Sequence, residues 1–264
     1  MLHHLLSIPL LLADLPNFLL GLALGVAGGL LGIGGGLIAI PVLAHFYGMD
    51  QQLAQGTALV MIAPNVLIGF IRYRQKNAIE LRAIAPMAMC AMLATYIAAR
   101  FVTGLNPRHL QIGFALFLLG LALYFGWHVV RRVRAVDGDP GVALAGRSAS
   151  PRVLPLLGLV SGVMSGLFTI GGGLVVVPAL VTMFGMTQTR AQGTALALVV
   201  PGALVALYAY AGAGHVSWAI GIPLALGGIV SVSWGVTLAH QFSPARLRVL
   251  FCAVLVGTAM MMLF

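Results

Sequence analysis

A glycine triplet and a nearby glutamine and threonine are the residues of this chain whose types and spacing could do chemistry. Each feature occurs twice, 137 positions apart and in the same register. The candidate substrate-binding residues are Gly34, Gly35, Gly36, Gln55, Thr57, Thr169, Gly171, Gly172, Gly173, Gln192 and Thr194. Backbone N–H groups at a break in a helix carry the positive end of the helix dipole, and amides and hydroxyls donate hydrogen bonds. Together these groups predict a binding site for a small anion, with no arginine needed inside a bilayer.

Both features also have a purely structural interpretation. Glycines are enriched where membrane helices pack closely, and Gln or Thr can cap a helix or bond to a neighbouring one. A continuous helix through either triplet would lose about 1 kcal/mol per glycine relative to alanine. Pro41 and Pro178, just beyond the triplets, each remove one more backbone donor. We therefore expect each triplet to break its helix at membrane depth, which lipid tolerates only around a cavity or within protein.

The composition requires a lipid environment for the segments that carry these residues. Hydrophobic residues make up 61% of the chain and charged residues 7%, and the mean hydropathy is +1.06. Since one span needs roughly 20 apolar residues, 264 residues can hold about six to eight spans. We predict an all-α polytopic membrane protein. The net charge of +9 comes from basic residues between apolar segments without interleaved aromatics, so it does not indicate nucleic-acid binding.

The duplication divides the chain into two halves. Apolar segments lie at about 17–46, 53–71, 83–101 and 108–130, and again at about 154–184, 190–211, 216–239 and 245–264. We predict a first transmembrane repeat over 1–130, a cytoplasmic linker over 131–152 and a second transmembrane repeat over 153–264. A duplicated unit of this length is typical of half a membrane transporter and too long for a solenoid repeat. The apolar N-terminal stretch lacks Lys, Arg and a small-residue cleavage site, so we expect it in the mature protein.

The distribution of Lys and Arg between the two sides of the membrane distinguishes two topologies for the first segment of each half. If that segment crosses the membrane once, the halves are parallel, and the 14 Lys and Arg residues split nine against five. If it enters and returns on the same side, the halves are inverted, and only Arg100 and Arg108 lie opposite the other twelve. Positive residues concentrate on the cytoplasmic side. We therefore favour two homologous, inverted repeats with broken or re-entrant first helices.

Side chains that other functions require are scarce. The five carboxylates lie at segment ends or in the linker, so no intramembrane acid is available as a proton relay or cation ligand. Cys90 and Cys252 lie in apolar segments without the spacing of a metal site. Four histidines lie near segment ends, where an interfacial place is the default: His45, His128, His215 and His240. We predict no catalytic residue, no metal and no cofactor, and hence no enzyme.

The doubled motif resembles a known family. GIGGGLIAIP at 32–41 and TIGGGLVVVP at 169–178, each followed by AQGTAL, are similar to the TauE/SafE family, the sulfite exporter and toluene sulfonate uptake permeases. The resemblance covers nearly the whole chain. It implies a multi-pass permease of the inner (plasma) membrane for a small sulfur-containing anion such as sulfite, sulfoacetate or thiosulfate. It also implies that both glycine triplets, together with Gln55, Thr57, Gln192 and Thr194, line the site.

These observations predict a transporter that works by alternating access between its two repeats. An anion channel of the same architecture would conduct without saturating, and a structural membrane protein would tolerate loss of the polar site residues. Both alternatives stay open. The expected partners are a small anionic substrate and the lipid bilayer. The transport direction, the coupling ion and a homodimeric state are left open by the sequence.

Overall fold

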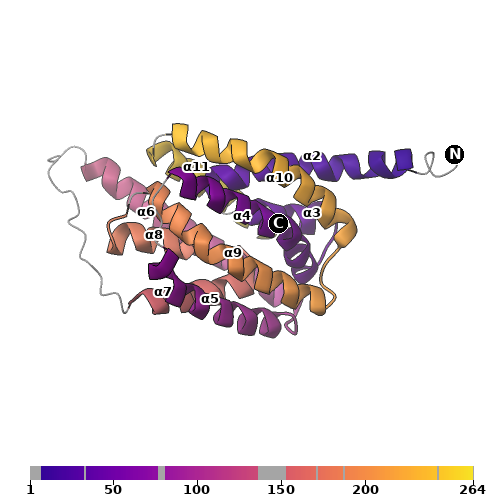
Figure 1. The fold of residues 1–264 in the computed structure, drawn as a ribbon, viewed down its shortest axis with the longest axis horizontal. Coiled ribbons are helices and arrows are strands. Elements are labelled where there is room, and N and C mark those ends of the chain that lie inside the picture. The colour runs from indigo at the N-terminus through magenta and orange to yellow at the C-terminus, as the bar shows by residue number, and fades with distance from the viewer. Residues whose placement is uncertain are drawn as a thin grey trace.

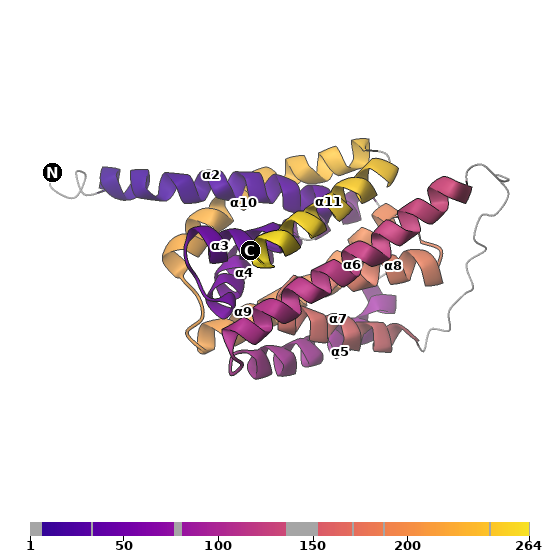
Figure 2. The same ribbon diagram turned by 180° about the vertical axis from the view of Figure 1, so that it is seen from behind.

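The chain folds into a long bundle of helices (Figures 1 and 2). A computed structural model describes residues 7–32, 34–76, 81–135, 153–170, 172–186, 188–242 and 244–263, and these contain helices but no strand. The first half holds α2 (Ser7–Leu31), α3 (Gly36–Phe46), α4 (Gln51–Lys76), α5 (Leu81–Val102) and α6 (Pro107–Ala135). The second half holds α7 (Val153–Phe168), α8 (Gly173–Met183), α9 (Gln188–Gly212), α10 (Trp218–Gln241) and α11 (Pro244–Leu263).

Six of these helices are long and apolar enough to cross a bilayer. They are α2, α4, α5, α6, α9 and α10, while α3, α7 and α11 contain shorter apolar stretches. In lipid every backbone N–H and C=O must find a partner within the protein, and a helix satisfies almost all of them internally. The predicted all-helical, polytopic membrane class is confirmed. Helix α6 continues through the arginines predicted to begin the linker and ends at Ala135, and residues 136–152 lie outside the described ones.

The helices follow the same order in both halves, with matching boundaries 137 positions apart. The starts of α3 and α8 are Gly36 and Gly173, and the starts of α6 and α11 are Pro107 and Pro244. The main contacts cross between the halves, because α2 packs along α10 and α7 packs along α5. The first helix of each half therefore packs against a helix of the other half.

Glycines bring these exchanged helices into backbone contact. Along α2, Gly21, Gly25 and Gly29 are so close to α10 that a Cβ would collide with its backbone or Ser231. Along α7, their counterparts Gly158, Gly162 and Gly166 meet α5 in the same way. Small residues at every fourth position let membrane helices approach closely, because their backbones then meet over a whole helix face.

Hydrogen bonds between the halves define the helix directions. Thr57 near the start of α4 contacts Ser217, which precedes α10, and Arg72 near the end of α4 contacts Ser233, so α4 and α10 run parallel. Tyr73 meets Gln192 while Tyr210 meets Gln55, so α4 and α9 run antiparallel. In Figures 1 and 2, the ends of α4, α6 and α10 consequently lie at one end of the molecule, with the starts of α7, α9 and α11.

Candidate functional site

The first segment of each half is broken at its glycine triplet. In the first half α2 stops at Leu31, and Gly32, Gly34 and Gly35 adopt positive φ values of 69°, 71° and 88° before α3 begins. In the second half α7 stops at Phe168, and Gly172 has a φ of 32° before α8 begins. Both breaks are therefore present where the sequence predicts them. Gly171 lies outside the described residues.

Thr169 takes the place of Gly32 at the second break. Its φ of 55° makes it the one residue other than glycine with a positive φ among those described. A side chain in this left-handed conformation costs roughly 1–2 kcal/mol. The Thr169 hydroxyl donates to the carbonyl of Phe168 at 2.8 Å, so its hydrogen is used locally. The structure places this candidate at the break, with its hydroxyl turned to the adjacent backbone.

Four of the candidate glycines are also confined by tight packing, and a Cβ at Gly34 would collide with the side chain of Val66. A Cβ at Gly35 would lie 2.7 Å from the carbonyl oxygen of Leu24, and a Cβ at Gly172 would collide with Ser161. A Cβ at Gly36 would collide with the side chain of Ile62. Gly173 differs, since its nearest neighbours would be 3.6 and 3.8 Å away, which is ordinary contact. Close packing therefore accounts for much of the glycine requirement, as the structural interpretation expects.

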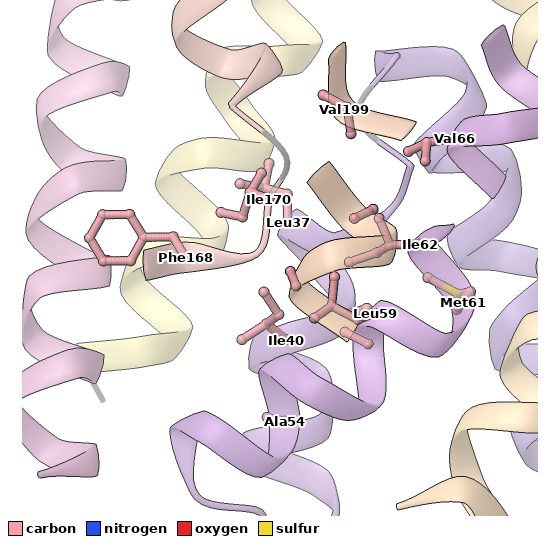
Figure 3. Close-up of a cluster of buried hydrophobic side chains, with 14 of the residues drawn as sticks. Leu37, Ile40, Ala54, Leu59, Met61, Ile62, Val66, Phe168, Ile170 and Val199 are labelled. Carbon is pink, nitrogen blue, oxygen red and sulfur yellow. The ribbon is translucent and has the colours of Figure 1, made fainter. Parts of the chain in front are cut away.

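The two breaks lie next to each other in the middle of the bundle. A Cβ at Gly36 would be 3.8 Å from the carbonyl oxygen of Thr169. Apolar side chains surround the meeting point, including Leu37, Ile62 and Ile170, which Figure 3 shows near one another. The ring of Phe168 packs on Phe117 of α6 with a centroid distance of 4.9 Å. The start of α3 and the second break therefore approach each other among closely packed apolar side chains.

Two buried tyrosine–glutamine pairs connect the halves beside these breaks. The Tyr73 hydroxyl donates to Gln192 Oε1 at 3.2 Å, and the Tyr210 hydroxyl donates to Gln55 Oε1 at 2.7 Å. Each pair is the counterpart of the other under the 137-residue register. Tyr210 also lies 3.4 Å from the carbonyl of Gly166, in the last turn of α7. The structure therefore brings the predicted Gln55 and Gln192 to equivalent places, one near each break.

The two glutamines differ in what their amide nitrogens reach. Gln192 Nε2 donates to the carbonyl of Leu31 at 3.5 Å, directly before the first break. Gln55 Nε2 is fully buried and has no hydrogen-bond partner. A buried donor without an acceptor costs about 1–3 kcal/mol. The Gln55 amide is therefore a donor that a ligand oxygen near the second break could satisfy.

The two candidate threonines lie one turn or less from these glutamines. Thr57 is fully buried, and its Oγ1 accepts the N–H of Ser217 at 3.0 Å, which ties α4 to the start of α10. Its hydroxyl therefore has a helix-connecting role in this conformation. Thr194 is 5% exposed on the first turns of α9, two residues after Gln192.

The residues predicted to line the site do not include Tyr73, Tyr210 or Asn65. Tyr73 and Tyr210 recur in register, which was the available signal for a shared role, but nothing in the sequence identifies their partners. Asn65 on α4 is fully buried, and both atoms of its amide group lack a partner. It lies against Gly228 of α10, where a Cβ would come within 2.5 Å of Asn65 Nδ2. The described residues contain no cluster of three or more His, Cys, Asp or Glu that could hold a metal ion.

Comparisons with known proteins agree with this architecture. The family model described as "Sulfite exporter TauE/SafE" matches residues 17–262. A protein of Methanocaldococcus jannaschii named as a probable membrane transporter is 26% identical over 268 residues, covering 96% of this chain and 94% of the relative. A protein of Xylella fastidiosa (strain Temecula1 / ATCC 700964) with the same description is 26% identical over 210 residues, covering 79% and 78%. This chain belongs to the TauE/SafE family of membrane transporters.

Proposed function

We propose that this transporter moves a small anion that binds between the two breaks. The proposal rests on the two tyrosine–glutamine hydrogen bonds that connect the halves, Tyr73 to Gln192 and Tyr210 to Gln55. Gln55 Nε2 is buried beside the second break and lacks an acceptor. No cation is needed within the bilayer, because amide donors and the starts of α3 and α8 supply positive partial charge. The glycine triplets, Gln55 and Gln192 form the proposed site, with Thr169 and Thr194 beside them. Thr57 can join them while it keeps its contact with Ser217, because Thr57 Oγ1 accepts that hydrogen bond and the contact does not use the hydroxyl hydrogen.

The proposed substrate is a sulfur-containing anion such as sulfite, sulfoacetate or thiosulfate. The description of the matching family model as a sulfite exporter supports this choice. Amide and backbone donors suit sulfonate-type oxygens, which accept hydrogen bonds in several directions. Carboxylates share part of this chemistry, so the experiment must compare both classes.

Alternating access is the proposed mechanism. The antiparallel course of α4 and α9 supports two inverted repeats, since these helices are counterparts in the sequence register. The tyrosine–glutamine contacts join the halves, so a movement of one repeat against the other would strain or exchange them. We also propose the inner membrane as the location, with repeats over 1–130 and 153–264, the linker on the cytoplasmic side, and a homodimer as the assembly.

A binding and transport experiment tests the proposal. Purified protein is screened by thermal shift against sulfite, sulfate, thiosulfate, sulfoacetate and simple carboxylates, because a ligand present at 100 times its Kd stabilises by about 2.7 kcal/mol. The anion that stabilises most is then followed into proteoliposomes. Saturable uptake supports a transporter, whereas flux that rises linearly with concentration would indicate a channel.

Replacing Gln55 links binding to the proposed site. We expect Gln55→Leu to weaken binding of the selected anion about ten- to hundredfold, because a hydrogen bond to a charged ligand contributes about 1.5–3 kcal/mol. Gln52→Leu is the matched control, since Gln52 is also buried but donates to the carbonyl of Leu105 at 2.7 Å. The control should lose stability and keep its affinity. Equal affinity for both variants and the wild type would exclude Gln55 from the site.

A further inference from the structure

A polar cavity lies at the end of the molecule opposite to Arg72 and Arg74. Its volume is about 540 Å³, and it lies between the last turn of α3, the starts of α4 and α6 and the last turn of α11. The polar side chains that line it belong to His45, Asp50, Gln51, Arg108 and Gln111. None of them belongs to the proposed anion site at the breaks.

The lining changes from exposed charged side chains to a buried amide. His45, Asp50 and Arg108 are exposed, whereas Gln51 is 3% exposed. Neither the oxygen nor the nitrogen of the Gln51 amide has a hydrogen-bond partner. A buried amide without partners is costly, and a polar ligand removes that cost. The inner end of the cavity therefore offers hydrogen bonds to a ligand that enters from the charged end.

The positive groups of the lining favour an anion as that ligand. No described residue pairs with the Arg108 guanidinium, while the backbone N–H of Arg108 donates to Asn106 Oδ1 at 3.0 Å. Helices α4 and α6, of 26 and 29 residues, both begin at the cavity with the positive ends of their dipoles. Asp50 Oδ1 accepts the N–H of Leu53 at 2.8 Å and so offsets the start of α4. Arg108 and the start of α6 remain uncompensated.

Gln51 connects the cavity to the proposed anion site. Gln51 and Gln55 are four residues apart on α4, so they lie on the same helix face with about 6 Å of rise between them. The amide nitrogens of both are buried without an acceptor. The neighbouring Gln52, in contrast, donates to the carbonyl of Leu105 at 2.7 Å, as expected of an amide that ties helices together. Two unsatisfied donors therefore lead from the cavity towards the second break.

The duplication repeats this glutamine pair at the other end of the bundle. Gln188 and Gln192 are the counterparts of Gln51 and Gln55, and they occur at the start of α9. Because α9 runs antiparallel to α4, its start lies at the arginine-rich end. The side chain of Gln188 lies outside the described residues. Alternating access requires one pathway at each end of the molecule, and the repeated pair provides the same residue types for both.

We propose that this cavity captures a small anion at the arginine-poor end and passes it along Gln51 to Gln55. Arg108 attracts the anion into the cavity, because a single-sign charge within low-dielectric walls raises the local concentration of its counter-ion. The Gln51 amide then replaces part of the water around the anion before it reaches the breaks. This inference rests on the proposed anion transport, but the charge preference of the cavity can be measured without it.

The reaction rates of a cysteine in the cavity measure that preference. Ala44→Cys, at a half-buried lining position, is made in a background without Cys90 and Cys252. It is treated with anionic sulfonatoethyl methanethiosulfonate and with the cationic trimethylammonium counterpart. The ratio of the two rates cancels the reactivity of the thiol itself. We expect a ratio at least about tenfold above that of a free thiol in solution, and a fall of about tenfold when Arg108→Gln is added.

A cysteine at the same end but outside the cavity is the control. Ala213→Cys lies at an exposed position between α9 and α10, and its rate ratio should not change when Arg108→Gln is added. A preference for the cationic reagent at Ala44→Cys would mean that Asp50 dominates the cavity, and it would overturn the inference. A ratio that ignores Arg108→Gln would do the same.

Transport by Gln51→Leu tests the pathway. In proteoliposomes, each transport cycle must use the cavity once, whichever way the protein is inserted. At anion concentrations well below Kd, we expect uptake to slow by about tenfold or more and Kd to change by less than about threefold, since the lost hydrogen bond lies on the route and not in the bound state. Gln52→Leu is the matched control and should keep the wild-type rate per folded protein.

The outcomes separate this inference from the proposed function. Wild-type uptake by Gln51→Leu would contradict the pathway. Block of uptake by the sulfonate reagent at Ala44→Cys but not at Ala213→Cys would support it. A wild type that moves no tested anion would refute the proposed function, while the rate ratios would still decide whether the cavity selects anions.

Discussion

At the scale of single residues, packing and backbone conformation explain the glycines better than ligand access alone. Gly35 and Gly172 both have positive φ and both touch backbone atoms of the preceding helix, at Leu24 and Ser161. A side chain there would disturb the fold before it could block a ligand. The residues that stay free to bind are the polar ones nearby, above all the amide of Gln55. The triplets therefore shape the site, and the amides are its proposed donors.

Adjacent glycines in the second triplet allow a direct test of this distinction. We expect Gly172→Ala to lower the free energy of unfolding by about 2 kcal/mol or more, because it combines a left-handed φ with a collision against Ser161. Gly173→Ala should be neutral or stabilise by up to about 1 kcal/mol, because it adds a helix-favouring residue with only ordinary contacts. Thermal unfolding in detergent measures both. Equal stability of the two variants would remove packing as the reason for the triplet.

At the scale of helices, much of the architecture could be predicted, because apolar runs and their interruptions are local properties. The predicted segments at 53–71 and 83–101 fall within α4 (Gln51–Lys76) and α5 (Leu81–Val102), and the breaks occur at the predicted triplets. The pairing of helices was not predicted. Tyr73 and Gln192 are separated by 119 residues, and no local pattern records such a contact. Likewise, α6 extends to Ala135 because arginine favours helices, although the apolar run ends earlier.

The packing of each first helix against the other half depends on glycines. Their spacing is visible in the sequence, but their partner helices are not. Gly21, Gly25 and Gly29 recur as Gly158, Gly162 and Gly166, and this spacing is a known signal of close helix contact in membranes. It does not name the partner helix. Only the folded chain reveals that α2 meets α10 and that α7 meets α5.

A methyl group added at this contact should therefore be costly. We expect Gly162→Ala to destabilise the protein by about 1–3 kcal/mol, since its Cβ would collide with the backbone of Ala91. Gly120→Ala on α6 is the control, because no atom lies within 4 Å of its added Cβ. The control should unfold at the wild-type temperature or slightly above it. A wild-type melting temperature for Gly162→Ala would mean that α5 and α7 are not in tight contact in the membrane.

At the scale of the whole molecule, the helix directions separate the basic residues by end. Arg72 and Arg74 lie at the end of α4, and α10 runs parallel to α4, so its last turn lies at the same end. Arg100 and Arg108 flank the turn between α5 and α6 at the opposite end. This distribution corresponds to the inverted arrangement favoured from the sequence, and it predicts that the arginine-rich end lies on the cytoplasmic side. The membrane orientation itself is the remaining prediction.

Labelling of single cysteines can determine that orientation. Cys90 and Cys252 are the only cysteines of the chain, so replacing both with alanine gives a background without thiols. Cysteines are then placed at three exposed positions, Arg74, Gln241 and Arg108. We expect a membrane-impermeant maleimide added to intact cells to label Arg108→Cys alone, and lysis to expose the other two, because α4 and α10 end on the arginine-rich side. Labelling of Arg74→Cys and Gln241→Cys from opposite sides would restore the parallel topology. Labelling of both from outside would keep the fold and reverse its orientation in the membrane.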